Sequence, residues 1–116
     1  MVHEITDETF EAEVAQSAVP CVIEFTAGWC DLCADMVAAC ERLSERFAGE
    51  VKFCTVDIDA QRALRIKFAV ASLPYVVFVA NGTKAPLFDE KVSEQRLEER
   101  IRRALAGDAL PTACPL

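Results

Sequence analysis

The apolar residues of the chain recur with two different periods, and the order of these periods predicts its helices and strands. Apolar side chains spaced three to four residues apart predict four amphipathic helices, at 7–18, 31–48, 60–69 and 93–107. Short apolar runs predict three strands, at 21–26, 51–58 and 75–80, and Asn81-Gly82 predicts a hairpin into an antiparallel strand near 86–92. Strands joined through helices pair in parallel with right-handed crossovers. The pattern therefore predicts an α/β fold in which helices cover both faces of a mixed sheet.

Length and composition limit the chain to one domain and exclude several kinds of partner. The 116 residues, of which 53% are hydrophobic, fit a single core at 1–107, followed by a tail at 108–116 that we expect to be mobile. The net charge of −7 argues against nucleic acid and against an anionic membrane surface. Neither a basic and apolar leader nor a run of about 18 apolar residues is present. We therefore expect a cytoplasmic monomer.

Five of the six cysteines fall into two groups, and the sixth, Cys114, lies in the tail. Cys21, Cys40 and Cys54 lie within apolar segments, where a free cysteine packs as a small hydrophobic residue. In a reducing cytosol, a disulfide is most often transient and catalytic. The pair Cys30 and Cys33 is placed differently, because it follows a predicted strand and begins a predicted helix.

This position favours thiol chemistry at Cys30 and Cys33. The free N–H groups at a helix start carry partial positive charge, which stabilises a thiolate. A spacing of three residues lets Cys33 resolve a mixed disulfide formed on Cys30, which we assign as the nucleophile. The alternative is half of a zinc site. A structural zinc site needs four ligands, and the sequence offers neither a second C-x-x-C nor a histidine pair, so we predict no metal.

Glu24 interrupts the apolar strand that precedes the cysteines. Burial of a carboxylate raises its pKa, so Glu24 could accept the proton of Cys33 during resolution. The alternative is a salt bridge at a sheet edge or a wetter strand face. We favour the role as a base.

Trp29 and Pro74 each allow two interpretations. Trp29, the only tryptophan, could shield the thiolate and contact a partner, or it could fill the core. Pro74 precedes a predicted strand, where a proline fits in the trans form as well as in the cis form. The residues themselves do not decide between these interpretations.

Taken together and in order, four segments of the chain resemble the thioredoxin family over about residues 5–106. They are Phe25-Thr26-Ala27-Gly28-Trp29-Cys30-Asp31-Leu32-Cys33, Val56-Asp57-Ile58-Asp59, Leu73-Pro74 and Asn81-Gly82. The resemblance implies the thioredoxin fold, with a central mixed sheet of four to five strands. It also implies that Cys30 attacks, that Cys33 resolves and that Pro74 is a cis-proline facing them. Leu73, Pro74 and Trp29 would contact the substrate, and Glu24 stands where the family has a buried aspartate.

The same resemblance implies the partners. Thioredoxins exchange disulfides with protein substrates, and a separate flavoprotein thioredoxin reductase passes electrons to them from NADPH. The redox-active group would be the Cys30–Cys33 disulfide, with no bound cofactor.

Several positions depart from the family pattern. Asp31 and Leu32 replace the usual Gly-Pro between the cysteines, and this pair tunes the redox potential. The lysine near the buried acid is Thr55 here, which is expected to raise the pKa of that acid further. The helix proline is Ala38, and a glycine of the substrate groove is Glu90. These changes predict an altered redox potential and an altered partner surface.

The sequence thus favours a thiol–disulfide oxidoreductase for protein substrates. The alternatives are a non-catalytic thioredoxin-fold interaction module and a thiol sensor that uses Cys40, Cys54 or the tail residue Cys114.

Overall fold

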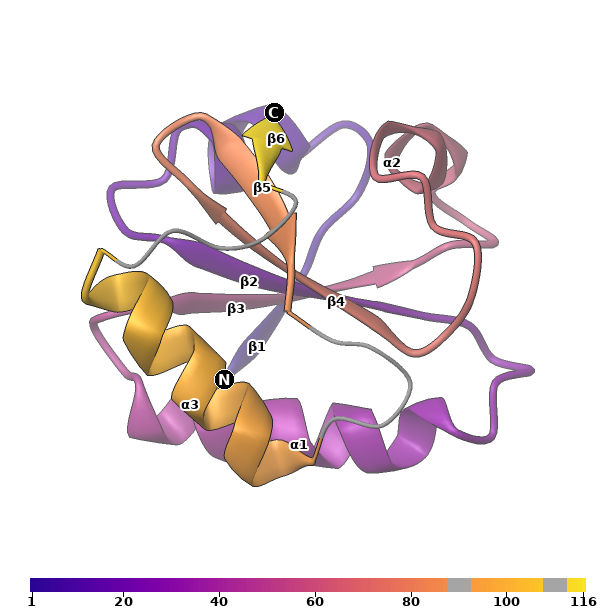
Figure 1. Cartoon of the computed structure of the whole chain (residues 1–116). Coiled ribbons are helices and arrows are strands. Elements are labelled where there is room, and N and C mark those ends of the chain that lie inside the picture. Colours follow the sequence, from indigo (N-terminus) through magenta and orange to yellow (C-terminus); the bar gives the residue numbers. More distant parts are fainter. Residues whose placement is uncertain (88–92, 108–112) are drawn as a thin grey trace.

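A six-stranded mixed sheet forms the centre of the molecule, with helical segments on both of its faces (Figure 1). The computed structural model describes residues 1–87, 93–107 and 113–116. Along the sheet the strand order is β1-β3-β2-β4-β5-β6. The strands are β1 (Val2–Glu4), β2 (Cys21–Thr26), β3 (Lys52–Asp57), β4 (Tyr75–Ala80), β5 (Thr83–Pro86) and β6 (Cys114–Pro115). The helical segments are the π-helix η1 (Glu11–Ala15) and the α-helices α1 (Cys33–Arg46), α2 (Arg62–Lys67) and α3 (Glu94–Leu105).

The sheet is parallel on one side of β2 and antiparallel on the other. Strands β1 and β2 both pair with β3 in parallel, whereas β4, β5 and β6 pair antiparallel with their neighbours. The turn between β4 and β5 has positive φ angles of 53° at Asn81 and 74° at Gly82. A tight hairpin turn needs these left-handed conformations, which asparagine and glycine adopt most readily. The predicted hairpin is confirmed.

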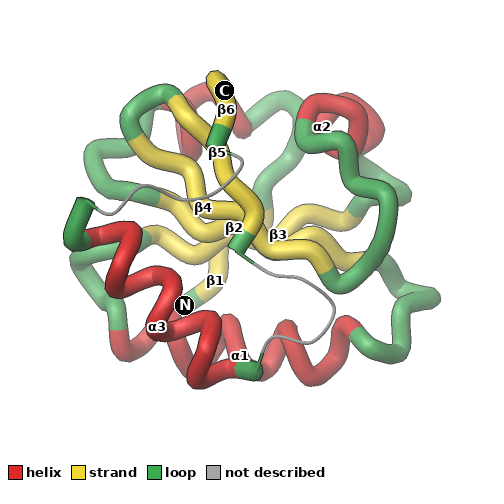
Figure 2. The backbone as a smooth tube through the Cα atoms, viewed as in Figure 1, coloured by secondary structure: helices red, strands yellow, loops and turns green. Residues whose placement is uncertain are grey.

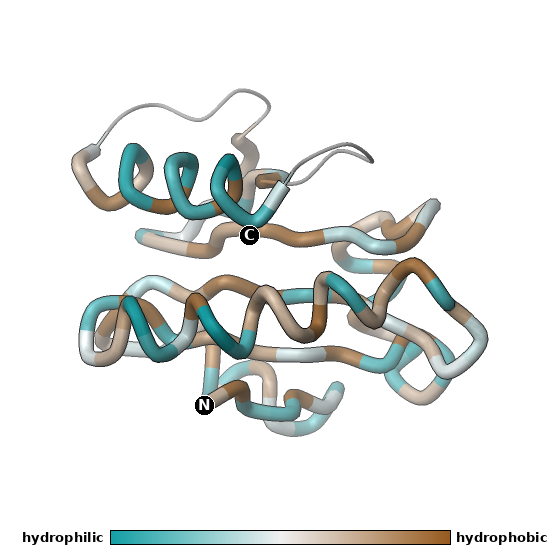
Figure 3. The backbone as a smooth tube through the Cα atoms, turned by 90° about the horizontal axis from the view of Figure 1, so that it is seen from below, coloured by the Kyte–Doolittle hydropathy of each residue, from teal (hydrophilic) through white to brown (hydrophobic). Residues whose placement is uncertain are grey.

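Two apolar clusters fill the space between the sheet and its two helical layers. Figure 2 shows how the helices lie on the two faces of the sheet. On one face, Val14 of η1 and Leu64 and Phe68 of the α2 region pack against Ile23 and Phe25 of β2. On the other face, α1 and α3 pack against residues of β2, β3 and β4. These are Val22, Phe53, Val76 and Phe78. Figure 3 shows the mixture of hydrophilic and hydrophobic residues along these helices. Strand β2 is therefore buried on both faces, as its apolar pattern predicted.

The last long helix begins where the sequence placed it. The Ser93 side chain accepts a hydrogen bond from the backbone N–H of Arg96 at 3.2 Å, which caps α3. None of the helices in the described parts of the chain combines the length and the apolar character that a bilayer crossing demands.

The sheet is wider than the four to five strands predicted. The two additional strands, β1 and β6, have three and two residues, too few for an alternating pattern to be recognised. Strand β5 begins at Thr83, directly after the hairpin turn, rather than near 86, because the turn contains only two residues. The segment 7–18 forms a short π-helix at its centre instead of a long α-helix.

The end of the C-terminal tail contacts the hairpin between β4 and β5. Residues 114–115 pair with β5, and the backbone N–H of Leu116 donates to the carbonyl of Gly82 at 2.8 Å. The Lys67 ammonium donates to the Leu116 carbonyl at 3.2 Å, and the Leu116 side chain packs on the core. These contacts tie the last residues to the hairpin, whereas 108–112 lie outside the described residues.

Candidate active site

Cys30 and Cys33 form a disulfide between the end of β2 and the start of α1. Their Cα atoms lie 5.4 Å apart. A turn closes the loop, since the N–H of Cys30 donates to the Ala27 carbonyl and that of Cys33 donates to the Cys30 carbonyl. Cys30 is half-buried, whereas Cys33 is buried as the first residue of the helix. Cys30 is therefore the more accessible of the two cysteines.

The start of α1 supplies a favourable field for a thiolate. The N-cap residue Leu32 makes no side-chain hydrogen bond to the first turn. The first amides of a helix have no partner within the helix and carry partial positive charge. A thiolate that forms beside such a helix start is stabilised by this charge.

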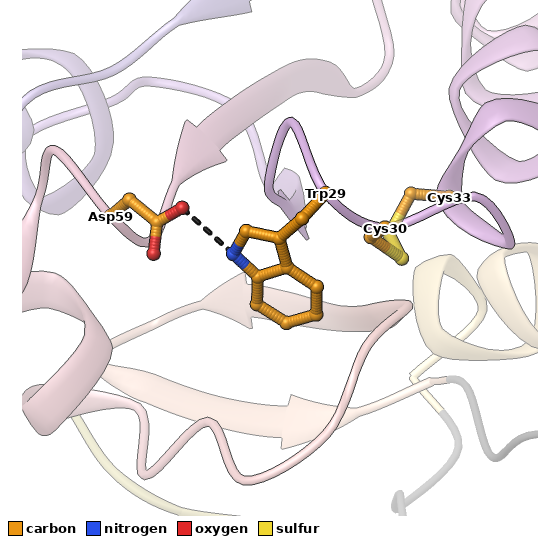
Figure 4. The surroundings of a disulfide bond; sticks show 4 residues. All are labelled: Trp29, Cys30, Cys33 and Asp59. Carbon is orange, nitrogen blue, oxygen red and sulfur yellow. Dashed lines mark hydrogen bonds between the residues drawn. A yellow bond between two sulfur atoms is a disulfide. The ribbon is translucent and has the colours of Figure 1, made fainter.

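Trp29 lies on the surface beside the disulfide. Its side chain is 65% exposed, which rules out the alternative of a core residue. The indole N–H donates a hydrogen bond of 2.8 Å to Oδ2 of Asp59, which follows β3 (Figure 4). The N–H of Asp59 in turn donates to the Asp57 carboxylate at 2.9 Å. The ring is thus held between Asp59 and the two cysteines.

Glu24 is buried within the centre of the sheet, and its side chain faces α1. The residue is only 3% exposed, and its Oε2 atom has no hydrogen-bond partner. Burial raises the pKa of Glu24 to about 7, while hydrogen bonds from Cys40 and Thr55 partly offset this effect. Its neighbours across the sheet are Thr55 on β3 and Val76 on β4, neither of which carries a charge. The alternative of a salt bridge at a sheet edge is excluded, because β2 is a central strand.

The peptide bond Leu73–Pro74 is cis, and it comes directly before β4. Tyr75, the next residue, pairs with Phe25 near the end of β2. The strand that leads to Cys30 and the strand that follows Pro74 therefore meet at the same end of the sheet. The disulfide and the cis-proline are both placed at this end by their strands.

The sequence is similar to those of proteins in one known family. The thioredoxin family profile matches residues 1–103. The chain belongs to the thioredoxin family. Similar proteins include thioredoxin C-2 of Corynebacterium nephridii, 32% identical over 66% of this chain and 71% of that protein. Another is a thioredoxin of Haemophilus influenzae, 33% identical over 67% of this chain and 73% of that protein.

A solved structure shares the fold. The crystal structure of chloroplastic thioredoxin z superposes with a TM-score of 0.78, covering 92% of this chain and 96% of that chain at 22% sequence identity. The chain thus has the thioredoxin fold, as predicted. With its Trp-Cys-x-x-Cys segment and close cysteine pair, it is a thiol–disulfide oxidoreductase of the thioredoxin type.

The remaining cysteines are free thiols. Cys21, Cys40 and Cys54 are buried, as their apolar surroundings predicted, and Cys114 is exposed. Burial and the nearby Glu24 carboxylate raise the pKa of Cys40, so its thiol stays protonated at neutral pH. In the described parts of the chain, no three histidine, cysteine, aspartate or glutamate side chains gather as a metal site would require.

The sequence did not predict one contact of the site, and one predicted site residue lies outside the described residues. Asp59 was part of the family resemblance but received no role, because nothing in the sequence pairs it with Trp29, thirty residues away. Glu90, expected on the substrate groove, lies outside the described residues.

Proposed function

We propose that Cys30 and Cys33 carry out thiol–disulfide exchange with protein substrates. In the reducing direction, the Cys30 thiolate attacks one substrate sulfur, a mixed disulfide forms and the first substrate thiolate leaves. The Cys33 thiolate then attacks Cys30 Sγ, which releases the second substrate thiolate and closes the protein disulfide. The observation that carries this assignment is the difference in burial between the half-buried Cys30 and the buried Cys33.

Glu24 is proposed to accept the proton that Cys33 loses during resolution. Its pKa of about 7 suits this role, because a base works best when its pKa is near the working pH. Its second oxygen, Oε2, has no hydrogen-bond partner and is free to accept a proton.

Trp29, Leu73 and Pro74 are proposed to contact the substrate. Support comes from the exposure of Trp29 and from the position of the cis-proline at the same end of the sheet as the disulfide. Asp31 and Leu32, which separate the two cysteines, are proposed to tune the redox potential.

The electron donor and the cellular setting are also proposals. We infer that a flavoprotein thioredoxin reductase reduces the disulfide, that the protein works as a monomer without a bound cofactor, and that it resides in the cytoplasm. The four free cysteines support a reducing compartment, where such thiols persist.

Reduction of insulin with dithiothreitol as electron donor tests the proposed function. The wild-type protein should accelerate insulin precipitation, and Cys30→Ser should abolish this acceleration. Cys114→Ser is the matched control, because it removes an exposed thiol distant in sequence from the pair and should leave the rate unchanged. No acceleration by the wild type, or full activity of Cys30→Ser, would contradict the proposal.

Trapping of mixed disulfides separates an enzyme from an interaction module. In Cys33→Ser the resolving thiol is missing, so Cys30 should remain joined to several different proteins after incubation with a cell extract. A non-catalytic module would give no such adducts, and the double variant Cys30→Ser, Cys33→Ser sets the background.

A further inference from the structure

The surface beside the disulfide carries two large exposed apolar side chains. Trp29 precedes Cys30 directly and is 65% exposed, and Leu32 precedes Cys33 directly and is 74% exposed. They rank among the most exposed large apolar residues described in this protein. Isolated exposed apolar residues are common, but here two of them flank the reactive sulfurs, where a substrate chain must dock.

Three carboxylates either contact Trp29 or stand close to the two cysteines in the chain. Asp31 lies between the cysteines, Asp35 lies in the first turn of α1, and Asp59 holds the Trp29 indole (Figure 4). All three are exposed. Between Ala27 and Glu41 the sequence contains neither lysine nor arginine. Arg42, the next residue, forms an ion pair with Glu94 and also interacts electrostatically with Asp35. The rim of the disulfide is therefore both apolar and negatively charged.

We propose that this rim selects substrate disulfides whose flanking residues are basic, with an apolar residue close by. The inference rests on the proposed exchange with protein disulfides and names the class of segment preferred. The occupant is an extended polypeptide in which lysine or arginine stands next to the cystine. The aliphatic part of this lysine or arginine side chain would pack on Leu32 or Trp29, and its charged end would lie near the aspartates.

Charge complementarity of this kind acts mainly on the rate of encounter. By Coulomb's law in water, one pair of unit charges about 7 Å apart changes the local concentration of a partner about threefold. Exchanging a flanking lysine for glutamate turns attraction into repulsion, so the rates should differ about tenfold. Because the Debye length falls from about 10 Å at 0.1 M salt to about 3 Å at 1 M, salt should remove the difference.

A set of matched disulfide peptides tests the preference. Three peptides of one sequence would carry lysine, glutamine or glutamate at a single position next to the cystine. The reduced protein is freed of reductant and mixed with each peptide, and oxidation of its dithiol is followed by the fluorescence of Trp29, the only tryptophan. Lysine should give a rate about ten times that of glutamate at low salt, with glutamine between them, and the three rates should converge at 1 M salt.

Variants assign the effect to the rim. Asp31→Asn with Asp35→Asn keeps the side-chain shapes and should lower the ratio of the lysine rate to the glutamate rate, while Asp59 keeps the remaining charge of the rim. The ratio is the quantity compared, since Asp31 also affects the reactivity of Cys30 toward every peptide. Glu50→Gln with Glu99→Gln, which removes the same charge from exposed positions far along the chain, should leave the ratio unchanged.

The outcomes separate this preference from the function itself. Equal rates for all three peptides, or an equal loss of the ratio in the control variant, would overturn the preference and leave disulfide exchange intact. Failure to oxidise the dithiol with any peptide would overturn both.

Discussion

Replacement of Glu24 by glutamine should stabilise the folded protein above neutral pH, because it removes a carboxyl group that must ionise inside the sheet. Glutamine has nearly the same shape, so the packing against α1 is kept. The substitution therefore isolates the cost of the charge. That cost follows from the shift of the Glu24 pKa from 4.5 to about 7 on burial.

The sign and size of the effect can be worked out from this shift. Between pH 4.5 and 7 the unfolded chain releases the Glu24 proton while the folded protein keeps it, so folding stability falls as pH rises. Above pH 7 both states are ionised and the loss is complete. At 1.36 kcal/mol per pH unit, the full loss is about 3 kcal/mol. The Glu24→Gln variant has no such loss, because its amide does not ionise.

Urea unfolding of the oxidised proteins at pH 5 and pH 8 measures the effect. The advantage of Glu24→Gln in the free energy of unfolding should be small at pH 5 and approach about 3 kcal/mol at pH 8. Glu50→Gln, an exposed control, should change stability by less than about 0.5 kcal/mol at either pH. An advantage that does not grow between pH 5 and pH 8 would refute the assignment of a raised pKa to Glu24.

Three further results are expected. Gly82→Ala should lower the free energy of unfolding by about 1 kcal/mol in urea, since φ is +74° there, whereas Gly28→Ala, with open space around the added carbon and no positive φ, should cost less. Leu43→Ala should cost about 2–5 kcal/mol in the same assay because its side chain is fully buried, and a smaller loss would mean that the core refills the cavity. In the oxidised native protein, a thiol reagent should modify Cys114 rapidly and the three buried cysteines only after unfolding; fast modification of more than one thiol would contradict their burial.

The reactive centre could be predicted from the sequence because its parts are neighbours in the chain. Cys30 and Cys33 stand three residues apart between an apolar strand and an amphipathic helix, and that order alone places them at a helix start. Glu24 was recognisable because one charged residue interrupts a strand that is otherwise apolar on both faces. The hairpin could also be predicted from its residue types, since asparagine and glycine tolerate its turn conformation.

What the sequence did not reveal depends on contacts between distant segments. The hydrogen bond of Trp29 to Asp59 joins two loops that only the pairing of β2 with β3 brings together. Whether Leu73–Pro74 is cis could not be read from the residues themselves, and the family resemblance supplied that prediction. Strand β6 has two residues, and its place beside β5 is fixed by the pairing of Lys84 with Cys114 rather than by any local pattern.

The short strand β6 has a consequence for how the protein behaves at high concentration. An open sheet edge offers unpaired backbone groups on which a second molecule can add its own strand. Here the outer strand ends the sheet with only Cys114 and Pro115, and proline has no N–H with which to extend a ladder. The opposite outer strand, β1, has only three residues. Both outer strands are therefore too short to pair extensively with a strand of a second molecule. This limits aggregation through the edges of a hydrophobic sheet.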